Sequence, residues 1–436
     1  MSIRKVAIIV LFSGAAVGER GLGTDDVVAW VDTDRARLQM VPAPQGTKFQ
    51  MTVAEFGVSL ARGDKCVQGV LSAWNAAPRK VLTTSSPCAD FSTAGVRDSR
   101  WPVSGVWNEL FEVLDVLAPT FLVVENVIGA LQDHKKPGDR CSFGKEFVVE
   151  MLRRQYDVAW RTICPSSFGL PHRRPRVFFI CSPAGLLQVE KVLLNSEASD
   201  AYRKRASKAA GQLAGAPKGW RDLSSAYSSS SSFLVRKGRD GKPVCSKFMT
   251  GMTSSGVRQP VYLRVQGEGS SRTRGGKRRW FRVGLGGLQR LWGLKDELMY
   301  RDERRRPQKI ESEKATALSL GSHCDVWKWL KGRIEGDIAR GETMNGRRVQ
   351  LRSNVGLTFK YKNLPEAGFA SVSDGKWTIR KAEVSPFPVW LERLSLEDVL
   401  LEDPKDTTIV QEVSDGGEVK MLDNWFKNCR EENEDE

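Results

Sequence analysis

The fold is decided by the stretch around residues 85–92, Ser85-Ser86-Pro87-Cys88-Ala89-Asp90-Phe91-Ser92. This stretch places a cysteine directly after a proline, just beyond the short apolar run Val81-Leu82. Because proline restricts the backbone, we expect the thiol of Cys88 on a rigid turn. A Pro-Cys step alone does not indicate catalysis, since most intracellular cysteines are buried as small apolar residues. Its meaning depends on two segments further along the chain.

These two segments supply the groups that a reactive cysteine needs. Phe121-Leu122-Val123-Val124 is typical of a buried strand and runs into Glu125-Asn126-Val127. Residues 168–176 are rich in arginine and lead into a further apolar run, Val177 to Cys181. A thiolate, a strand-end carboxyl and an arginine together suit attack on an electron-poor ring, because they can add to the ring, protonate a ring nitrogen and hold a carbonyl oxygen. A helix cap is the alternative interpretation of the Glu-Asn pair.

The N-terminal residues have the pattern of a nucleotide-binding α/β unit. Val6 to Leu11 is a continuous apolar run, as expected for a strand covered on both faces, and residues 12–18 supply the small residues of a tight turn. A second strand, Val27 to Val31, ends in Asp32, where such folds bind ribose hydroxyls. An ordinary strand-to-helix turn is the alternative for the glycine-containing segment.

The order and spacing of these motifs resemble those of the cytosine-C5 DNA methyltransferases, over about residues 5–183 and again over about residues 285–330. The resemblance implies an α/β fold class, with a doubly wound, mostly parallel sheet of the S-adenosylmethionine-dependent methyltransferase type. It implies an inserted target-recognition domain and a C-terminal extension. It also implies methyl transfer from S-adenosyl-L-methionine to C5 of a cytosine flipped out of double-stranded DNA, through a covalent cysteine adduct.

The same resemblance assigns catalytic roles. Cys88 attacks C6 of cytosine as a thiolate, and Glu125 grips N3 and N4 of the base. Arg174 and Arg176 align with the two arginines of the family pattern Gln-x-Arg-x-Arg, and Arg176 is expected at the cytosine O2. His172 stands where the family has Gln. Because its ring can still donate a hydrogen bond, this departure does not remove the match.

Cofactor-binding residues are also carried over from the family. Asp32 is expected to hold the ribose of S-adenosylmethionine. Gly63-Asp64 resembles the next motif, whose acid meets the adenine, although a surface turn is an alternative. The late segment 288–294 resembles an Arg-Leu-Gln-Gly-Phe motif, with Gly286-Gly287 in place of the usual Arg-Glu. The full set of expected cofactor contacts is Phe12, Gly14, Gly18, Asp32, Thr33, Asp64, Pro87, Val106, Gly321 and Ser322, where Ser322 replaces the usual Asn.

Helical periodicity predicts the elements that connect the strands. Val106, Leu110, Leu114 and Leu117 recur at spacings of three and four, which indicates a crossover helix that ends before Pro119. In the family, the preceding loop, about Phe91 to Pro102, closes over the flipped base. A helix over about 143–154, a strand over about 158–163, and a helix carrying Val326, Trp327 and Leu330 complete the predicted core.

The interval from 184 to 284 is the expected target-recognition region. A basic cluster there has no acidic residue among its members, and phosphate contact is its natural interpretation in this context, with a solvated loop as the alternative. The expected nucleic-acid-binding residues are Arg272, Arg274, Lys277, Arg278 and Arg279. A net charge of +15 favours the same polyanionic partner, double-stranded DNA.

The predicted organisation has four parts: a first catalytic part over 1–183, the recognition region over 184–284, a closing catalytic part over 285–335 and a C-terminal extension over 336–436. The extension carries no known motif and could bind a protein partner. It contains short β-like pieces at Val355 to Tyr361 and at Lys376 to Ile379.

Composition limits the remaining possibilities. The eight cysteines show no paired spacing, so neither a metal site nor a disulfide framework is expected, and a reducing compartment fits. Arg4-Lys5 before an apolar run imitates a secretory signal, but the run is short and no stretch is long enough to span a membrane. Localisation is expected to be nuclear in a eukaryote and cytoplasmic otherwise.

Three related functions stay open from the sequence. One is the same chemistry on RNA, as a branch of the family performs on transfer RNA. Another is a catalytically silent DNA-binding or regulatory relative, which the departures at His172, Gly286 and Ser322 keep possible. Amino-group methylation is disfavoured, because its Asn/Asp-Pro-Pro-aromatic loop is not found in the chain. An unrelated nucleotide-binding α/β protein would explain Asp32 but not the later motifs.

Overall fold

The structure is a computed structural model of the 436-residue chain. It describes residues 6–87, 106–132, 143–164, 172–194, 233–237, 243–246, 249–250, 262–266, 278–283, 289, 292, 294, 298, 313–314, 317–318, 321–338, 363–373, 376–382 and 407–413. The chain divides into two compact units. Unit 1 comprises residues 1–163, 175–197 and 321–387, and unit 2 comprises residues 164–174, 198–320 and 388–436.

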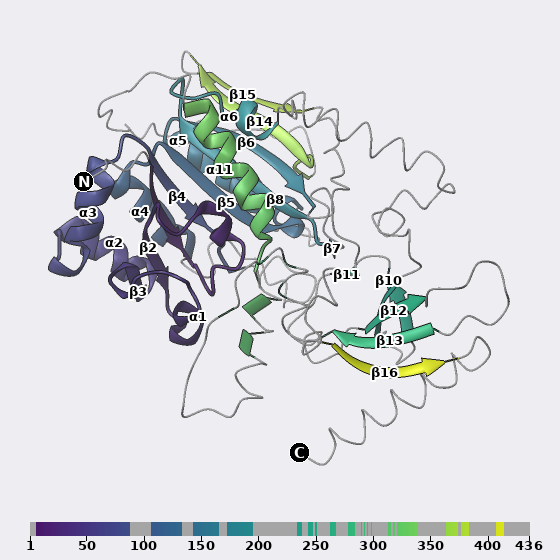
Figure 1. The fold of residues 1–436 in the computed structure, drawn as a ribbon. Coiled ribbons are helices and arrows are strands. Elements are labelled where there is room, and N and C mark those ends of the chain that lie inside the picture. The colour runs from purple at the N-terminus through teal and green to yellow at the C-terminus, as the bar shows by residue number, and fades with distance from the viewer. Residues whose placement is uncertain are drawn as a thin grey trace. The chain divides into compact units, whose positions relative to one another are not determined.

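Unit 1 is built on a nine-stranded sheet with the order β15-β14-β6-β8-β5-β4-β1-β2-β3 (Figure 1). The strands β1, β2, β3, β4 and β5 pair with one another in parallel. From β5 outward, the strands β8, β6, β14 and β15 continue the sheet in antiparallel pairs. Their bounds are β1 Ala7–Leu11, β2 Val27–Asp32, β3 Lys48–Gln50, β4 Lys80–Thr84, β5 Phe121–Val127, β6 Tyr156–Ile163, β8 Arg176–Pro183, β14 Ala367–Ser373 and β15 Lys376–Lys381. The predicted α/β fold class is confirmed.

Helices cover both faces of this sheet, which explains why its central strands are apolar throughout. The four helices α2 Val53–Arg62, α3 Gln68–Ala76, α4 Val106–Leu117 and α5 Phe143–Arg153 contribute to one continuous core cluster with one face of the strands. The helix α11, Cys324–Ile338, lies against the other face, where the Trp327 ring meets the Phe178 ring at a centroid distance of 5.6 Å. Short helices complete this unit: α1 Arg35–Gln39, α6 Val189–Leu193, η1 Glu19–Leu22, η2 Gln45–Thr47, η3 Lys65–Val67 and η4 Ile128–Leu131.

The helices predicted from periodicity are confirmed. In α4, Leu110, Leu114 and Leu117 are buried, as their spacing indicated. In α11, Val326, Trp327 and Leu330 are buried in the same way. The sequence analysis did not anticipate α2, which begins with a capping box in which Thr52 and Glu55 satisfy each other's backbone N–H groups.

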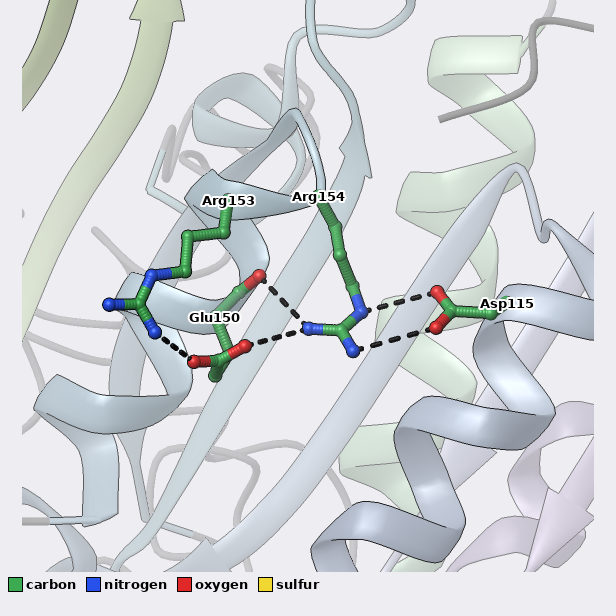
Figure 2. Close-up of polar contacts among 4 residues, drawn as sticks. All are labelled: Asp115, Glu150, Arg153 and Arg154. Atoms are coloured by element: carbon green, nitrogen blue, oxygen red, sulfur yellow. Dashed lines mark hydrogen bonds and ion pairs between the residues drawn. The ribbon is translucent and has the colours of Figure 1, made fainter. Parts of the chain in front are cut away.

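An arginine at the end of α5 fastens this helix to α4 (Figure 2). Arg154 lies 3.2 Å from Asp115 of α4, measured from Nε to Oδ1, and 2.8 Å from Glu150, measured from Nη1 to Oε2. Its guanidinium also lies 4.4 Å from the centroid of the Phe111 ring. Because only 11% of the Arg154 side chain is exposed, solvent screens these interactions less than it screens ordinary surface pairs.

A hairpin from the C-terminal part of the chain extends the main sheet. The strand β14 pairs with β6, and β15 pairs with β14. The carboxylate of Asp157 fixes the hairpin, because it accepts hydrogen bonds from the backbone N–H groups of Val372 at 3.0 Å and Gly185 at 3.1 Å. The strand predicted at Lys376 to Ile379 is therefore present, and it belongs to the sheet of unit 1 rather than standing apart from it.

Unit 2 contains a five-stranded antiparallel sheet with the order β10-β9-β12-β13-β16. The strands are β9 Phe233–Lys237, β10 Pro243–Ser246, β12 Tyr262–Gln266, β13 Arg278–Val283 and β16 Thr407–Val413. A separate pair joins β7, His172–Arg173, to β11, Met249–Thr250. The predicted strand at Val355 to Tyr361 lies outside the described residues. Among the helices that the structure describes, none is long and apolar enough to cross a membrane.

Candidate active site

The parallel half of the sheet brings several motif residues to one edge. Register pairs Leu11 with both Val31 and Thr84, and Thr84 in turn with Val124. The residues that follow, Phe12, Asp32, Ser85 and Glu125, therefore meet at the carboxyl edge of the sheet. In open α/β folds this edge is where ligands bind.

The glycine-containing turn after β1 is clamped to the end of β2. The backbone N–H of Ser13 donates to the Val31 carbonyl at 3.0 Å, and that of Gly14 donates to Asp32 Oδ2 at 2.7 Å. Asp32 Oδ1 accepts from the backbone N–H of Asp34 at 2.8 Å. Each carboxylate oxygen carries two lone pairs, so Asp32 retains acceptor capacity for a ribose hydroxyl.

The same turn holds two non-glycine residues in the left-handed region, with φ of 53° at Phe12 and 52° at Ala16. Such a conformation costs roughly 1–2 kcal/mol per residue, and it persists only where the surrounding structure enforces it. Gly14 also has a positive φ, of 51°. Unusual backbone geometry of this kind clusters at ligand-binding sites, which fits the predicted cofactor role of this turn.

The start of the α11 segment packs directly on this turn. A Cβ atom on Gly18 would lie 2.1 Å from Ser322 Oγ and 2.6 Å from Trp327 Cδ1. A Cβ atom on Gly321 would lie 2.5 Å from the Val17 Cβ. Ser322 is buried, and its hydroxyl oxygen accepts a hydrogen bond from Trp327 Nε1 at 2.6 Å. The structure thus brings together Gly18, Gly321 and Ser322, which are more than 300 residues apart at their extremes.

Two other predicted cofactor residues lie less clearly in this site. Thr33 is exposed, directly after Asp32. Asp64 lies in the turn after α2, and α2 has ten residues, which separates this turn by about 15 Å along the helix from the end of β3. The carboxyl end of β3 carries Gln50 and Met51 instead.

The proposed nucleophile lies outside the described residues. The described segment that follows β4 ends at Pro87, which is exposed, and Cys88 is the next residue. The expected loop from Phe91 to about Pro102 is outside it as well. Val106 begins α4, and its backbone position is described.

The predicted carboxyl and arginine do meet. Glu125 is buried on β5, and Arg176 begins the neighbouring strand β8. Arg176 Nε lies 3.1 Å from Glu125 Oε1. Their strands pair in antiparallel fashion, with Val127 opposite Arg176. A low dielectric constant in the surroundings strengthens the attraction between the two side chains, and their contact holds both in a fixed orientation.

The residue after Glu125 links this pair to the end of β4. Asn126 is buried, and its Nδ2 donates to Ser86 Oγ at 3.0 Å. Its Oδ1 accepts from the backbone N–H of Val127 at 2.7 Å. The end of β5 is therefore fastened to the residue that precedes Pro87. The sequence analysis quoted Asn126 in its motif and gave it no role.

A buried glutamate that the sequence analysis did not single out lies beside this group. Glu19 begins η1, and Ser85 donates a hydrogen bond from its hydroxyl to Glu19 Oε1. Burial, together with the like charge of Glu125, raises the pKa of Glu19 from 4.5 to about 7. A glutamate within a run of small and apolar residues was the available signal, but its burial depends on tertiary packing.

The first arginine of the motif belongs to the other compact unit. Arg174 is buried and belongs to unit 2, whereas Arg176 belongs to unit 1.

Among the described residues, no group of three or more His, Cys, Asp or Glu side chains is arranged to hold a metal ion.

The expected nucleic-acid-binding residues are partly described. Arg272, Arg274 and Lys277 lie outside the described residues. Arg278 and Arg279 are neighbours on β13 of unit 2.

Part of the chain is similar to known proteins. Residues 73–240 match the family model described as C-5 cytosine-specific DNA methylase. Type II methyltransferase M.DdeI of Desulfomicrobium norvegicum is 27% identical over 99 residues, which is 22% of this chain and 22% of that protein. The match therefore spans about a fifth of the length of this curated relative.

Solved structures of methyltransferases are also similar. S. pombe Dnmt2 methyltransferase has a TM-score of 0.45 and 15% identity, over 76% of this chain and 99% of that chain. The Entamoeba histolytica methyltransferase EhMeth has a TM-score of 0.42 and 12% identity, over 77% of this chain and 99% of that chain.

Proposed function

The chain is a member of the cytosine-C5 methyltransferase family, and from this premise we propose that it methylates C5 of a flipped-out cytosine in double-stranded DNA through a covalent adduct of Cys88. The observation that carries the proposal is the pair of the buried Glu125 and the partly buried Arg176 at the carboxyl edge of the sheet. Asn126 and Ser86 connect this pair to the strand end from which Pro87 and Cys88 follow.

Cys88, Glu125 and Arg176 each have a defined part in this chemistry. The Cys88 thiolate adds to C6 while the carboxyl of Glu125 donates a proton to N3, which it recovers when the thiolate leaves, and Arg176 holds O2. C5 thereby becomes the nucleophile that takes the methyl group. Loss of the C5 proton then expels the thiolate and restores the aromatic ring. Extrusion of the base from the duplex costs roughly a few kcal/mol.

The turn after β1 fits the methyl donor, S-adenosyl-L-methionine. Its backbone is held open in the left-handed region at Phe12 and Gly14, and Asp32 keeps lone pairs for a ribose hydroxyl. This turn is supported by the close packing of Gly321 and Ser322 against the segment that contains Gly18. The donor supplies an electrophilic methyl group, and the residues of the chain bind it and orient it toward the cytosine.

Double-stranded DNA is the proposed substrate for two reasons. The matching family model describes DNA methylases, and the chain carries a net charge of +15. The same site could act on RNA, which makes the choice of nucleic acid the first thing to test. Radiolabelled methyl transfer would be measured to duplex DNA and to transfer RNA, with wild type beside Glu125→Gln.

The outcomes of this assay are distinct. Label in DNA that Glu125→Gln abolishes supports the proposal. Label in transfer RNA alone contradicts the DNA substrate and keeps the chemistry. Binding of DNA and S-adenosylmethionine without any transfer contradicts catalysis, and would identify the chain as a binding protein.

A further inference from the structure

Glu19 is the buried titratable group that the proposed reaction leaves unexplained. It belongs to η1, in the segment that follows the glycine turn, and it lies beside the catalytic carboxyl rather than in the cofactor turn itself. Only 3% of its surface is exposed. Carboxyl groups are almost never buried to this extent without a partner, so its position calls for a specific role.

The contact that Glu19 makes is at the approach to Cys88. Ser85 donates its hydroxyl hydrogen to Glu19, and the next residue, Ser86, accepts a hydrogen bond from Asn126. Two successive residues are therefore held from two sides, immediately before Pro87. Because proline fixes its own φ, the backbone at Pro87 has little freedom beyond this fixed strand end.

The surroundings of Glu19 favour its neutral form. Burial is the main cause of its raised pKa, which is about 7, and the like charge of Glu125 adds to it. The bonds from Ser85 and from the backbone N–H groups of Gly18 and Glu19 oppose this rise. Among the described residues, Glu125 is the charged group that acts on Glu19, and Arg176 of β8 pairs with Glu125. On the side of α11, Cys324 experiences the charge of Glu19 together with those of Arg20, Asp325 and Lys328.

On the basis of the proposed function, we propose that Glu19 is a positioning residue of the cytosine site, which in its neutral form holds the Ser85 end of β4 and leaves the charge of Glu125 paired with Arg176. When Glu19 ionises, a second buried negative charge lies near Glu125 and repels it. The Glu125–Arg176 pair then no longer presents the geometry that the cytosine requires. Glu19 acts through Ser85 and Glu125, and it does not itself touch the base.

The variant Glu19→Gln tests the charge of residue 19 separately from its hydrogen bond with Ser85. The amide keeps an oxygen that accepts from Ser85, but it cannot ionise. Wild type loses activity as pH rises through the ionisation of Glu19, whereas Glu19→Gln does not. We therefore expect the ratio of kcat for Glu19→Gln to kcat for wild type to rise about threefold or more between about pH 6 and about pH 8.5. The opposite limb due to the cysteine thiolate cancels in this ratio.

Two further variants test the hydrogen bond. Glu19→Ala and Ser85→Ala each remove it, and we expect each to lower kcat about tenfold at every pH, with KM nearly unchanged. Because both act through one contact, the double variant should be no worse than the poorer single variant. Glu112→Gln is the matched control, since Glu112 is an exposed carboxyl on α4 and its change should leave the pH profile as in wild type.

The experiment is methyl transfer to duplex DNA by the full chain, with thermal unfolding of each variant measured beside it. A pH-dependent ratio for Glu19→Gln and non-additive losses for Glu19→Ala and Ser85→Ala support the proposal. Transfer by wild type with one common pH profile for all variants overturns the role of Glu19 and leaves the proposed function intact. Failure of wild type to transfer methyl to any nucleic acid overturns the proposed function and, with it, the role of Glu19.

Discussion

Asn126 donates from its side-chain amide to the hydroxyl oxygen of Ser86, and this one bond of 3.0 Å ties the strand that carries Glu125 to the strand that leads to Cys88. Both partners are buried. The end of β5 that carries Glu125 is therefore held to the end of β4 by a side-chain contact as well as by the sheet.

Removal of this contact should reduce catalysis more than stability. For Asn126→Ala we expect a loss of about 1–3 kcal/mol in the free energy of unfolding, and a fall of about 10²-fold in kcat, because a small displacement of catalytic groups is costly. Ser86→Ala should behave similarly, and a double-mutant cycle should show coupling. Ser371→Ala removes an exposed hydroxyl contact on the β14–β15 hairpin and serves as control. Equal kcat for Asn126→Ala and wild type would contradict this account.

Replacement of either Glu125 or Arg176 should strongly reduce catalysis. Arg176→Ala removes the guanidinium beside the buried Glu125, and we expect kcat to fall about 10²-fold or more, with little change in DNA binding. Arg176→Lys keeps the charge but not the planar fork, so it should recover only part of the activity. The measurement is single-turnover methyl transfer beside a DNA-binding titration. A parallel loss of binding and turnover would instead assign Arg176 to the nucleic-acid backbone.

Packing at the cofactor turn gives a sharp steric test. Gly18 has φ of −78°, which any residue can adopt, so the cost of Gly18→Ala comes only from the collision with Ser322 and Trp327. We expect a loss of about 2 kcal/mol or more in stability, and weaker binding of S-adenosylmethionine. Gly69→Ala is the matched control: its Cβ meets no atom within 4 Å, and alanine in a helix should be neutral or stabilising by up to about 1 kcal/mol.

Thermal unfolding of the two Gly18 and Gly69 variants by circular dichroism checks this expectation, with S-adenosylmethionine binding followed by calorimetry. If Gly18→Ala unfolds at the wild-type temperature, the segment from Gly321 to Trp327 does not pack on the turn as described.

The raised pKa of Glu19 predicts how stability depends on pH. In the folded state this carboxyl binds its proton up to about pH 7, whereas in the unfolded chain it loses the proton near its ordinary pKa of 4.5. The folded state therefore holds more protons between these values, and stability falls as pH rises through this window. The loss amounts to about 3 kcal/mol at most. Glu19→Gln removes it.

The unfolding free energies of wild type and Glu19→Gln should be compared at about pH 5 and about pH 8. The variant should gain stability relative to wild type at the higher pH. A constant difference between the two proteins would mean that Glu19 is already ionised in the folded state.

The central strands and the crossover helices could be predicted from the sequence because their patterns reflect burial directly. Strand β1, with the sequence Ala-Ile-Ile-Val-Leu, is buried along its whole length, and α4 places its leucines on one face. Strand β3 has only three residues and is defined by its pairing with β2. Strand β14 lies far along the chain. Its Gly368 packs so closely on Trp160 that a Cβ atom at residue 368 would lie 2.1 Å from the indole.

The candidate site shows the same division. Glu125, Arg176 and Asp32 could be found because they follow apolar strands in a recognisable order. The contacts of Glu19, Ser86 and Ser322 could not, because each depends on a partner that the fold brings from a distant segment. Asp64 illustrates the limit of a local pattern: Gly63-Asp64 matched a motif, and in the structure Asp64 lies in the turn between α2 and η3, so its contact with the adenine stays a prediction.

The most direct test of the account is covalent trapping on duplex DNA that contains 5-fluorocytosine. Fluorine at C5 cannot leave as a proton does, so methylation stops at the adduct between the enzyme and C6. With S-adenosylmethionine present, wild type should form a denaturation-resistant complex with the DNA, and Cys88→Ala should form none while it still binds the duplex. An adduct that persists in Cys88→Ala, or the absence of any adduct in a wild type that methylates normal DNA, would contradict the assignment of Cys88 as the nucleophile.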